Sequence, residues 1–111
     1  MANEEHLSFL KKGVEAWNRW RKQNLQTKPN LRGANLGEAD LTGANLREAD
    51  LEEAKLIEPL LTKADLTEAN LTGAELSGAH LTGAKLSGAS LICASLISTD
   101  FSGANLTDCS I

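Results

Sequence analysis

The chain has 111 residues, of which 41% are hydrophobic and only 4% aromatic, so any core must be built from Leu and Ala rather than from large rings. Its length fits a single domain, and its two cysteines are too few for a disulfide framework. A net charge of −4 argues against a general nucleic-acid binder, because phosphate binding needs a basic surface.

Residues 1–25 are predicted to form an amphipathic helix over 3–24, with Asn3 as its N-cap and with Trp17 and Trp20 in its apolar half. Gly13 also lies in the apolar half, and a close approach of another backbone would explain it. We interpret this helix as a cap on the structure that follows, with residues 26–30 as the linker. The cap requires both Trp side chains to be buried. The alternative is a helix that binds a membrane surface or a partner.

A five-residue repeat runs through residues 31–111. A small residue, usually Ala, stands two positions before each large apolar residue, and Asp or Asn often lies between them. A period of five fits neither a helix nor a strand, so the chain must turn once per repeat. We expect Leu and Ala to point inward from short extended stretches, joined by turns in which Gly takes a positive φ. Where Glu replaces that Gly, we expect a different turn. The large apolar positions are Leu31, Leu36, Leu41, Leu46, Leu51, Leu56, Leu61, Leu66, Leu71, Leu76, Leu81, Leu86, Leu91, Leu96, Phe101, Leu106 and Ile111.

The tandem pattern Ala-(Asp/Asn)-Leu-x-x resembles the pentapeptide-repeat family. The resemblance covers residues 31–111 and implies an all-β solenoid, a right-handed quadrilateral β-helix with four repeats in each coil. Residues 31–111 would then make about four coils behind the N-terminal α-helical cap. Residues 20 apart would stack, which places Lys55 and Glu75, and likewise Asp65 and Lys85, within reach of a cross-coil ion pair.

A few apolar residues take positions that are polar in the other repeats, and one further apolar residue, Ile111, ends the last coil. Leu60 follows Pro59, where a local bulge could hide it. The sequence stops on a core position, and three explanations stay open: end-to-end dimerisation, fraying of the last residues, or loss of a natural C-terminal part. The candidate interaction surface is formed by Ile57, Leu60, Ile92, Cys93, Ile97 and Ile111.

We predict no catalytic, cofactor or metal site. His6 and His80 have no partner at ligand spacing, and no glycine-rich phosphate-binding motif is present. Cys93 should face outward and Cys109 inward, which speaks against both a disulfide and a zinc site. The expected protein is therefore non-enzymatic and needs no cofactor.

Charge is divided unequally along the chain. Residues 31–111 hold 12 acidic and 5 basic residues, a net charge of −7, whereas residues 1–30 hold 3 acidic and 6 basic residues, a net charge of +3. We expect a small rigid protein-interaction or scaffold module in the cytoplasm, with an unidentified protein partner, no direct nucleic-acid binding and no stable membrane insertion. A homodimer through the C-terminal coil is a further hypothesis. The alternative function, suggested by the resemblance, is DNA mimicry that inhibits or protects a type II topoisomerase.

Overall fold

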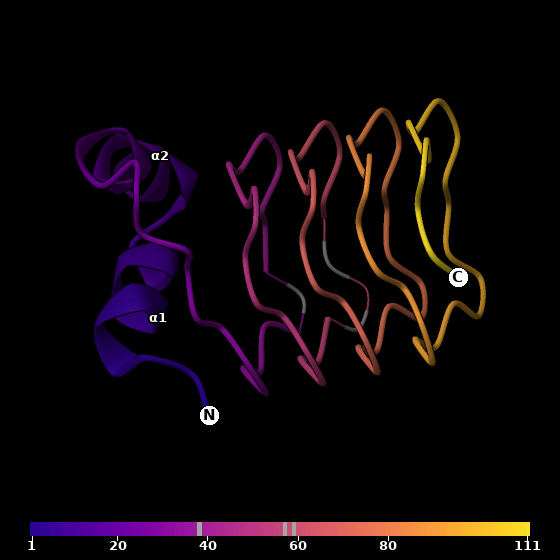
Figure 1. Cartoon of the computed structure of the whole chain (residues 1–111), viewed down its shortest axis with the longest axis horizontal. Helices are drawn as coiled ribbons and strands as arrows, with labels where there is room; N and C mark the ends of the chain where they lie inside the picture. Colours follow the sequence, from indigo (N-terminus) through magenta and orange to yellow (C-terminus); the bar gives the residue numbers. More distant parts are fainter. Residues whose placement is uncertain (38, 57, 59) are drawn as a thin grey trace.

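The computed structural model describes residues 1–37, 39–56, 58 and 60–111. The molecule measures 32 × 22 × 20 Å. Two helices lie at one end of the long axis, and the repeat coils stack along that axis behind them (Figure 1). In the part of the chain that is described, no helix is long and apolar enough to cross a membrane.

The N-terminal cap consists of two helices, α1 (Glu4–Lys11) and α2 (Val14–Gln23), so the prediction of one continuous helix is wrong. The chain breaks at Gly13, whose φ of 112° is a conformation that residues with a Cβ rarely adopt. Close packing does not explain this glycine, because a Cβ placed there would meet no atom within 4 Å. The predicted N-cap is confirmed, since the Asn3 side chain accepts hydrogen bonds from the amides of Glu5 and His6, the second and third residues of α1.

Residues from Asn30 onward form a right-handed quadrilateral β-helix of four coils, as the sequence predicted. Parallel bridges join each bridging residue to the one 20 positions later, from Asn30 and Asp50 to Ser90 and Ser110. Each described side contributes a single bridging residue, so pairing between coils is short and repeats on every side. The backbone amides and carbonyls of neighbouring coils bond at 2.6–3.0 Å along the solenoid.

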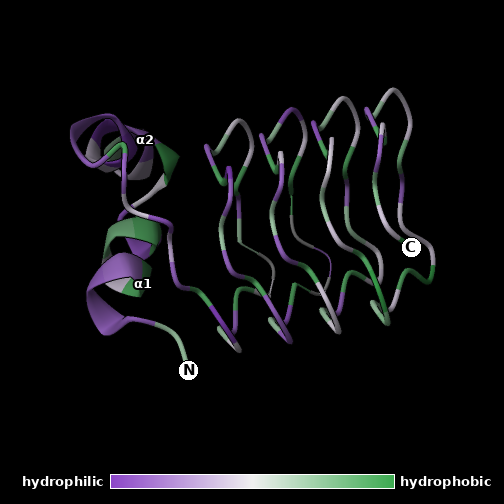
Figure 2. Ribbon diagram, in the orientation of Figure 1, coloured by the Kyte–Doolittle hydropathy of each residue, from purple (hydrophilic) through white to green (hydrophobic). Residues whose placement is uncertain are grey.

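The core is a column of leucine and alanine. All the leucines of the five-residue series from Leu31 to Leu91 are buried, together with almost all the alanines two positions before them. Apolar and polar residues alternate around each coil for this reason (Figure 2). Burial decreases in the last coil, where Leu96 and Phe101 are half-buried and Leu106 and Ile111 are exposed. The predicted inward column is therefore confirmed through Leu91, and an exposed end layer follows it.

The Asp and Asn residues before the large apolar residues stabilise the corners. At nine of these positions the side-chain Oδ1 accepts a hydrogen bond of 2.9–3.2 Å from the amide two residues later. This is an Asx turn, for which the short side chains of Asp and Asn are suited. The nine residues are Asn30, Asn35, Asp40, Asn45, Asp50, Asp65, Asn70, Asp100 and Asn105.

The second corner residue takes a positive φ whether or not it is glycine. Glycines at this position have φ of 68–73°, and the non-glycine residues have φ of 56–62°. The expectation of a different backbone conformation at the Glu corners is therefore wrong for those that the structure describes; Glu38 lies outside the described residues. The left-handed region is unfavourable for residues with a Cβ. At the five such corners that precede the last coil, the amide of the positive-φ residue donates to a carbonyl of the next coil, which holds the backbone in this conformation. The non-glycine residues are Glu48, Glu53, Glu58, Lys63, Glu68, Cys93, Ser98 and Asp108.

The cap packs directly on the first coil. Trp17 is fully buried and Trp20 is 8% exposed, which meets the condition set for a cap. The Trp17 indole donates to the Asn45 carbonyl at 2.8 Å. The buried Arg21 guanidinium donates to the carbonyls of Thr27, Asn45 and Arg47 at 2.7–3.2 Å, and so joins α2 to the linker and to the first coil.

Candidate interaction surface

One side of the last coil presents apolar residues to solvent. Ile92 is 47% exposed and Ile97 is 71% exposed, and both follow an inward leucine position at a corner. Cys93 lies next to Ile92 and is also exposed. Because these side chains point away from the column, the stacking of coils does not cover them.

The same part of the chain carries no charge. Residues 86–99 are the longest stretch without Asp, Glu, Lys or Arg, and we call them the neutral segment. Three of its hydroxyls bond to the coil before: Ser90 to Thr72 at 2.9 Å, Ser95 to Ser77 at 3.0 Å, and Thr99 to the Leu76 carbonyl at 2.7 Å. A partner covering this segment would therefore remove little strongly held water, and protein interfaces have a similarly low charge at their centres.

The end layer of the last coil is apolar and has unpaired backbone groups. Leu106 is 36% exposed and Ile111 is 78% exposed. The amides of Leu96, Phe101 and Leu106 have no hydrogen-bond partner among the described residues, whereas the matching leucines one coil earlier donate to the last coil. This edge has the geometry to continue the pairing between coils.

The remaining predicted residues do not join this surface. Leu60 is 41% exposed and lies two coils away, in a column with Asp40, His80 and Asp100. The predicted residue Ile57 and the bulge proposed at Pro59 lie outside the described residues. The structure thus places Ile92 and Cys93 at one corner of the last coil, Ile97 at the next corner and Ile111 at the end of the same coil, and separates Leu60 from them.

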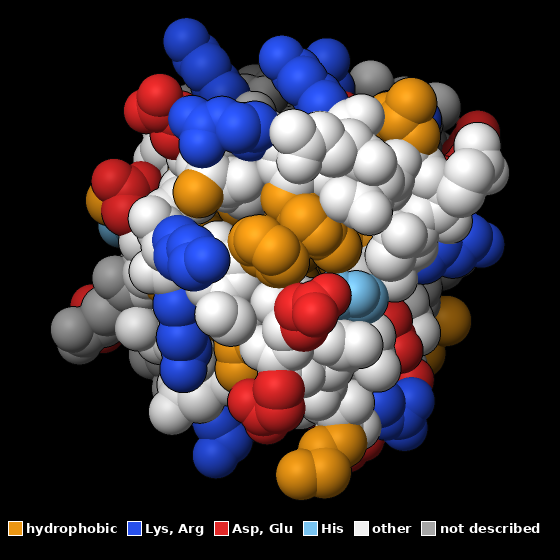
Figure 3. Space-filling model, turned by 90° about the vertical axis from the view of Figure 1, so that its left-hand side faces the viewer, with side chains coloured by type: hydrophobic (Ala, Val, Ile, Leu, Met, Phe, Trp, Pro, Cys, Tyr) orange, Lys and Arg blue, Asp and Glu red, His pale blue; other side chains and the backbone are white. Residues whose placement is uncertain are grey.

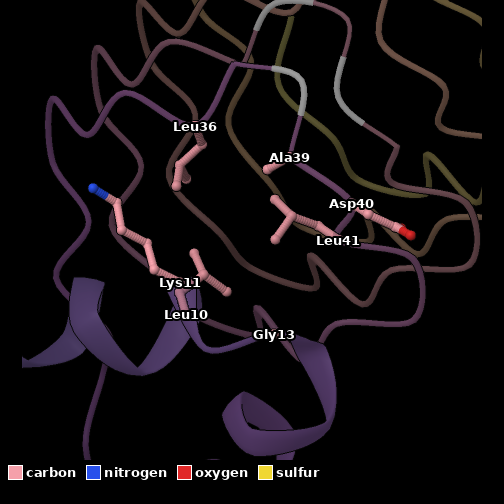
Figure 4. A pocket seen from close by; sticks show the side chains of 7 residues that line it. All are labelled: Leu10, Lys11, Gly13, Leu36, Ala39, Asp40 and Leu41. Atoms are coloured by element: carbon pink, nitrogen blue, oxygen red, sulfur yellow. The ribbon is translucent and has the colours of Figure 1, made fainter.

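A second feature was missed by the sequence analysis. A pocket with a volume of about 320 Å³ lies between the cap and the first coil (Figure 4). Its signal in the sequence is Gly13, which was assigned to the interior of one helix. The lining comes from the hinge of the cap and from two neighbouring sides of the coil: Leu10, Lys11, Gly13, Leu36, Ala39, Asp40 and Leu41.

Ion pairs between coils differ from those predicted. Lys55 and Glu75 stack as expected, and so do Asp65 and Lys85, but neither forms an ion pair in the described structure. Asp65 pairs instead with Arg47 at 3.4 Å. Burial acts to raise the pKa of Asp65, but hydrogen bonds from Thr67 and the Arg47 charge lower it overall.

Acidic residues of the first coils are further neutralised by bases. Arg32 bonds to Glu52 at 2.7 Å, and Lys28 lies 3.5 Å from Glu48. On the cap face, Lys and Arg side chains gather toward the top and one side, and an apolar area lies near the centre with an acidic side chain and a histidine below it (Figure 3). The negative charge of the solenoid is therefore interrupted by bases at its capped end.

The histidine and cysteine side chains can be described from their surroundings. No group of three His, Cys, Asp or Glu residues in the described chain could hold a metal ion. Both cysteines are free, and burial raises the pKa of the Cys109 thiol, which makes it a poorer nucleophile at neutral pH. His6 uses Nδ1 to accept a hydrogen bond of 3.0 Å from the Asn30 amide, which is a structural role.

Comparison with known proteins identifies the family. The family of pentapeptide repeats matches residues 30–58, 49–88 and 69–108, with eight copies. A comparison with curated protein sequences gives no match.

Three solved structures share the fold. The pentapeptide repeat protein alr5209 from Nostoc PCC 7120 is 31% identical with a TM-score of 0.70, and the alignment covers 78% of this chain and 72% of alr5209. Rfr23 from the cyanobacterium Cyanothece 51142 is 34% identical with a TM-score of 0.54, covering 77% of this chain and 66% of Rfr23. HetL from Nostoc sp. strain PCC 7120, involved in heterocyst differentiation regulation, is 36% identical with a TM-score of 0.50, covering 74% of this chain but only 46% of HetL. The match to repeats over most of the chain and the shared fold show that this chain belongs to the pentapeptide-repeat family.

Proposed function

We propose that this protein is a non-enzymatic, rigid protein-interaction module that binds a partner protein through the neutral segment, with Ile92 and Ile97 as its apolar contacts. The observation that carries the proposal is the exposure of both isoleucines on a stretch without charge. Complete burial of such a side chain contributes about 1.5–3 kcal/mol. The solenoid holds the two contacts at fixed positions, so little conformational entropy is lost on binding.

The partner expected from this chemistry is a protein with a matching apolar, weakly charged surface. A second copy of this chain meets that description, since it carries the same segment. Self-association of this kind would extend to the exposed end layer at Leu106 and Ile111, which lies on the same coil.

The test compares a double variant with a matched control. Ile92→Ser and Ile97→Ser together remove the apolar contacts, whereas Leu60→Ser removes an exposed leucine from a different part of the solenoid. Mass in solution is measured over a range of concentrations, and partner proteins are captured from the native host and quantified by mass spectrometry. We expect the double variant to lose the association that the wild type and Leu60→Ser retain. Equal association by all three proteins would refute this surface.

The DNA-mimic alternative predicts a different result. Mimicry depends on a continuous acidic surface, and bases such as Arg32 and Arg47 interrupt the acids of the first coils. We therefore expect the protein to leave DNA supercoiling by gyrase unchanged. Inhibition or protection of gyrase would favour mimicry over the interaction module.

A further inference from the structure

The cap closes two of the four sides of the first coil by hydrogen bonding. On one side, the Asn30 amide donates to His6 Nδ1 at 3.0 Å, and the Asn30 carbonyl accepts from the Asn3 amide at 2.9 Å. On a second side, the Asn45 amide donates to Asn18 Oδ1 at 2.8 Å, while its carbonyl accepts from Trp17 and Arg21. The cap thus replaces the coil that would otherwise precede these two sides.

The other two sides are open. The backbone amides and carbonyls of Asn35 and Asp40 have no hydrogen-bond partner among the described residues, and both residues are exposed. One coil further on, the equivalent groups are paired: the Lys55 amide donates to Ala34 and the Leu60 amide donates to Ala39. The unpaired amides and carbonyls of Asn35 and Asp40 therefore form a β edge to which a further strand could hydrogen-bond.

The pocket lies beside this edge. Leu36, Ala39 and Leu41 face it from the coil and Leu10 faces it from α1, so most of its wall is apolar (Figure 4). Lys11 also lines it from α1, with its amine on the side opposite Asp40. Asp40 stands at one rim, with its carboxylate directed away from the pocket. A volume of about 320 Å³ is at the lower end of the range for ligand sites, about 300–1,000 Å³, which limits the occupant to a few small residues.

We propose that the open edge at Asp40 binds an extended segment of a partner protein with the pattern apolar–basic–apolar, which adds one rung to the β-helix. The register of the solenoid fixes the pairing. The Asp40 amide donates to the carbonyl of the first residue of the segment, and the amide of the third residue donates to the Asp40 carbonyl. Leu60 makes these same two bonds to Ala39 and Leu41 in the next coil. Main-chain pairing of this kind supplies affinity, and side chains at alternate positions supply specificity.

The chemistry of the segment follows from side-chain alternation. Its first and third side chains point inward over Ala39 and Leu41 and must be apolar. Its middle side chain points outward over the Asp40 carboxylate, so a Lys or Arg is favoured there. Cross-coil pairing of this kind already occurs between Arg32 and Glu52 at 2.7 Å, 20 residues apart. Hydrogen bonds from Thr42 lower the pKa of Asp40, which keeps the carboxylate charged.

The sequence itself supplies a matched pair of probes. Residues 83–88 read Gly-Ala-Lys-Leu-Ser-Gly, and residues 73–78 read Gly-Ala-Glu-Leu-Ser-Gly, so the two hexapeptides differ only in the middle charge. Both are prepared with blocked ends and titrated into the isotope-labelled full chain, and amide chemical shifts and hydrogen exchange are recorded. We expect changes at Asp40, Leu41 and Lys11, slower exchange of the Asp40 amide, and binding of the Lys peptide about three- to fivefold tighter than that of the Glu peptide.

Two variants test the contact. Asp40→Asn removes the charge but retains an acceptor for the Thr42 amide, as Asn35 and Asn45 show in neighbouring repeats, and it should abolish the preference for the Lys peptide. Asp100→Asn makes the same change at an equivalent corner of the last coil and should leave the preference intact.

Other results would overturn the inference. The inference is overturned if chemical-shift changes are confined to the last coil or if the two peptides bind with equal affinity. It is also overturned if the Asp40 amide shows no change at millimolar peptide. The site does not depend on the neutral segment, so the Ile92→Ser and Ile97→Ser variant should bind the Lys peptide as the wild type does. The two proposals can therefore fail separately.

Discussion

Replacement of Arg21 by Met tests how the cap is held on the solenoid. The Arg21 side chain is 8% exposed, and its guanidinium donates three hydrogen bonds to backbone carbonyls. Met retains much of the apolar stem but leaves the carbonyls of Thr27 and Arg47 without this donor, whereas the Asn45 carbonyl keeps its bond from Trp17. An unsatisfied buried polar group costs about 1–3 kcal/mol, and part of that cost is offset because a buried charge is removed. We expect the free energy of unfolding to fall by about 2–3 kcal/mol.

Two optical signals separate the cap from the solenoid. Both Trp residues of the protein lie in α2, so fluorescence reports on the cap, while circular dichroism reports on the whole chain. Urea and thermal unfolding are followed by both signals. At about 4–8 °C for each kcal/mol, the Arg21→Met variant should melt roughly 10–20 °C lower, with the fluorescence change coming first.

A neighbouring arginine is the control for this prediction. Arg19 lies on the same helix and pairs with Glu15 at 3.8 Å, with both side chains well exposed. Arg19→Met should therefore lower the free energy of unfolding by less than about 0.5 kcal/mol. If Arg21→Met has an effect as small as Arg19→Met, the hydrogen bonds to the carbonyls do not hold the cap, and the reasoning is refuted.

Two further predictions concern the corners and pH. Gly33→Ala should lower the free energy of unfolding by about 1 kcal/mol, because φ is 68° there and the new Cβ meets no other atom. Gly78→Ala should lower the free energy of unfolding by more, because its Cβ would lie 2.9 Å from Glu58 Cγ. Chemical denaturation of both variants measures the difference. Burial lowers the pKa of the His6 imidazole, which means that the folded protein favours the neutral ring. The contribution of neutral His6 to the free energy of unfolding should therefore be complete above about pH 6.5 and be lost as the pH falls through the lowered pKa. Fluorescence-detected unfolding between pH 7.5 and 5 should show this loss in the wild type and in His80→Gln, but not in His6→Gln.

The regular part of the fold could be predicted because one rule repeats. Leu and Ala must both face inward every five residues, and this requirement fixes the register of each side and the stacking of residues 20 apart. A single apolar position would not have distinguished a coil from a helix, but an uninterrupted series did. The burial of Trp17 and Trp20 was likewise predictable, since both lie on one apolar face of α2.

The departures from prediction arise where tertiary contacts outweigh local preference. Glu53 and Lys63 adopt the left-handed conformation because the hydrogen bonds of the stacked coils impose it, although neither residue favours it alone. Asp65 pairs with Arg47 rather than with the stacked Lys85, since the reach and direction of long side chains are not contained in the 20-residue period. The open edge at Asp40 depends on which sides the cap reaches, and sequence alone does not give that placement.

Gly13 connects the shape of the cap to the open edge. A pair of helices can reach only part of a four-sided coil: the start of α1 reaches the side with Asn30, and α2 reaches the side with Asn45. The hinge between the helices lines the pocket beside Asp40, where glycine has no side chain with which to bond the coil. A Cβ at the hinge would have free space around it, so the glycine is set by its φ of 112° and not by packing. The break that lets two helices cover two sides therefore also leaves the adjoining pocket and the Asp40 backbone accessible.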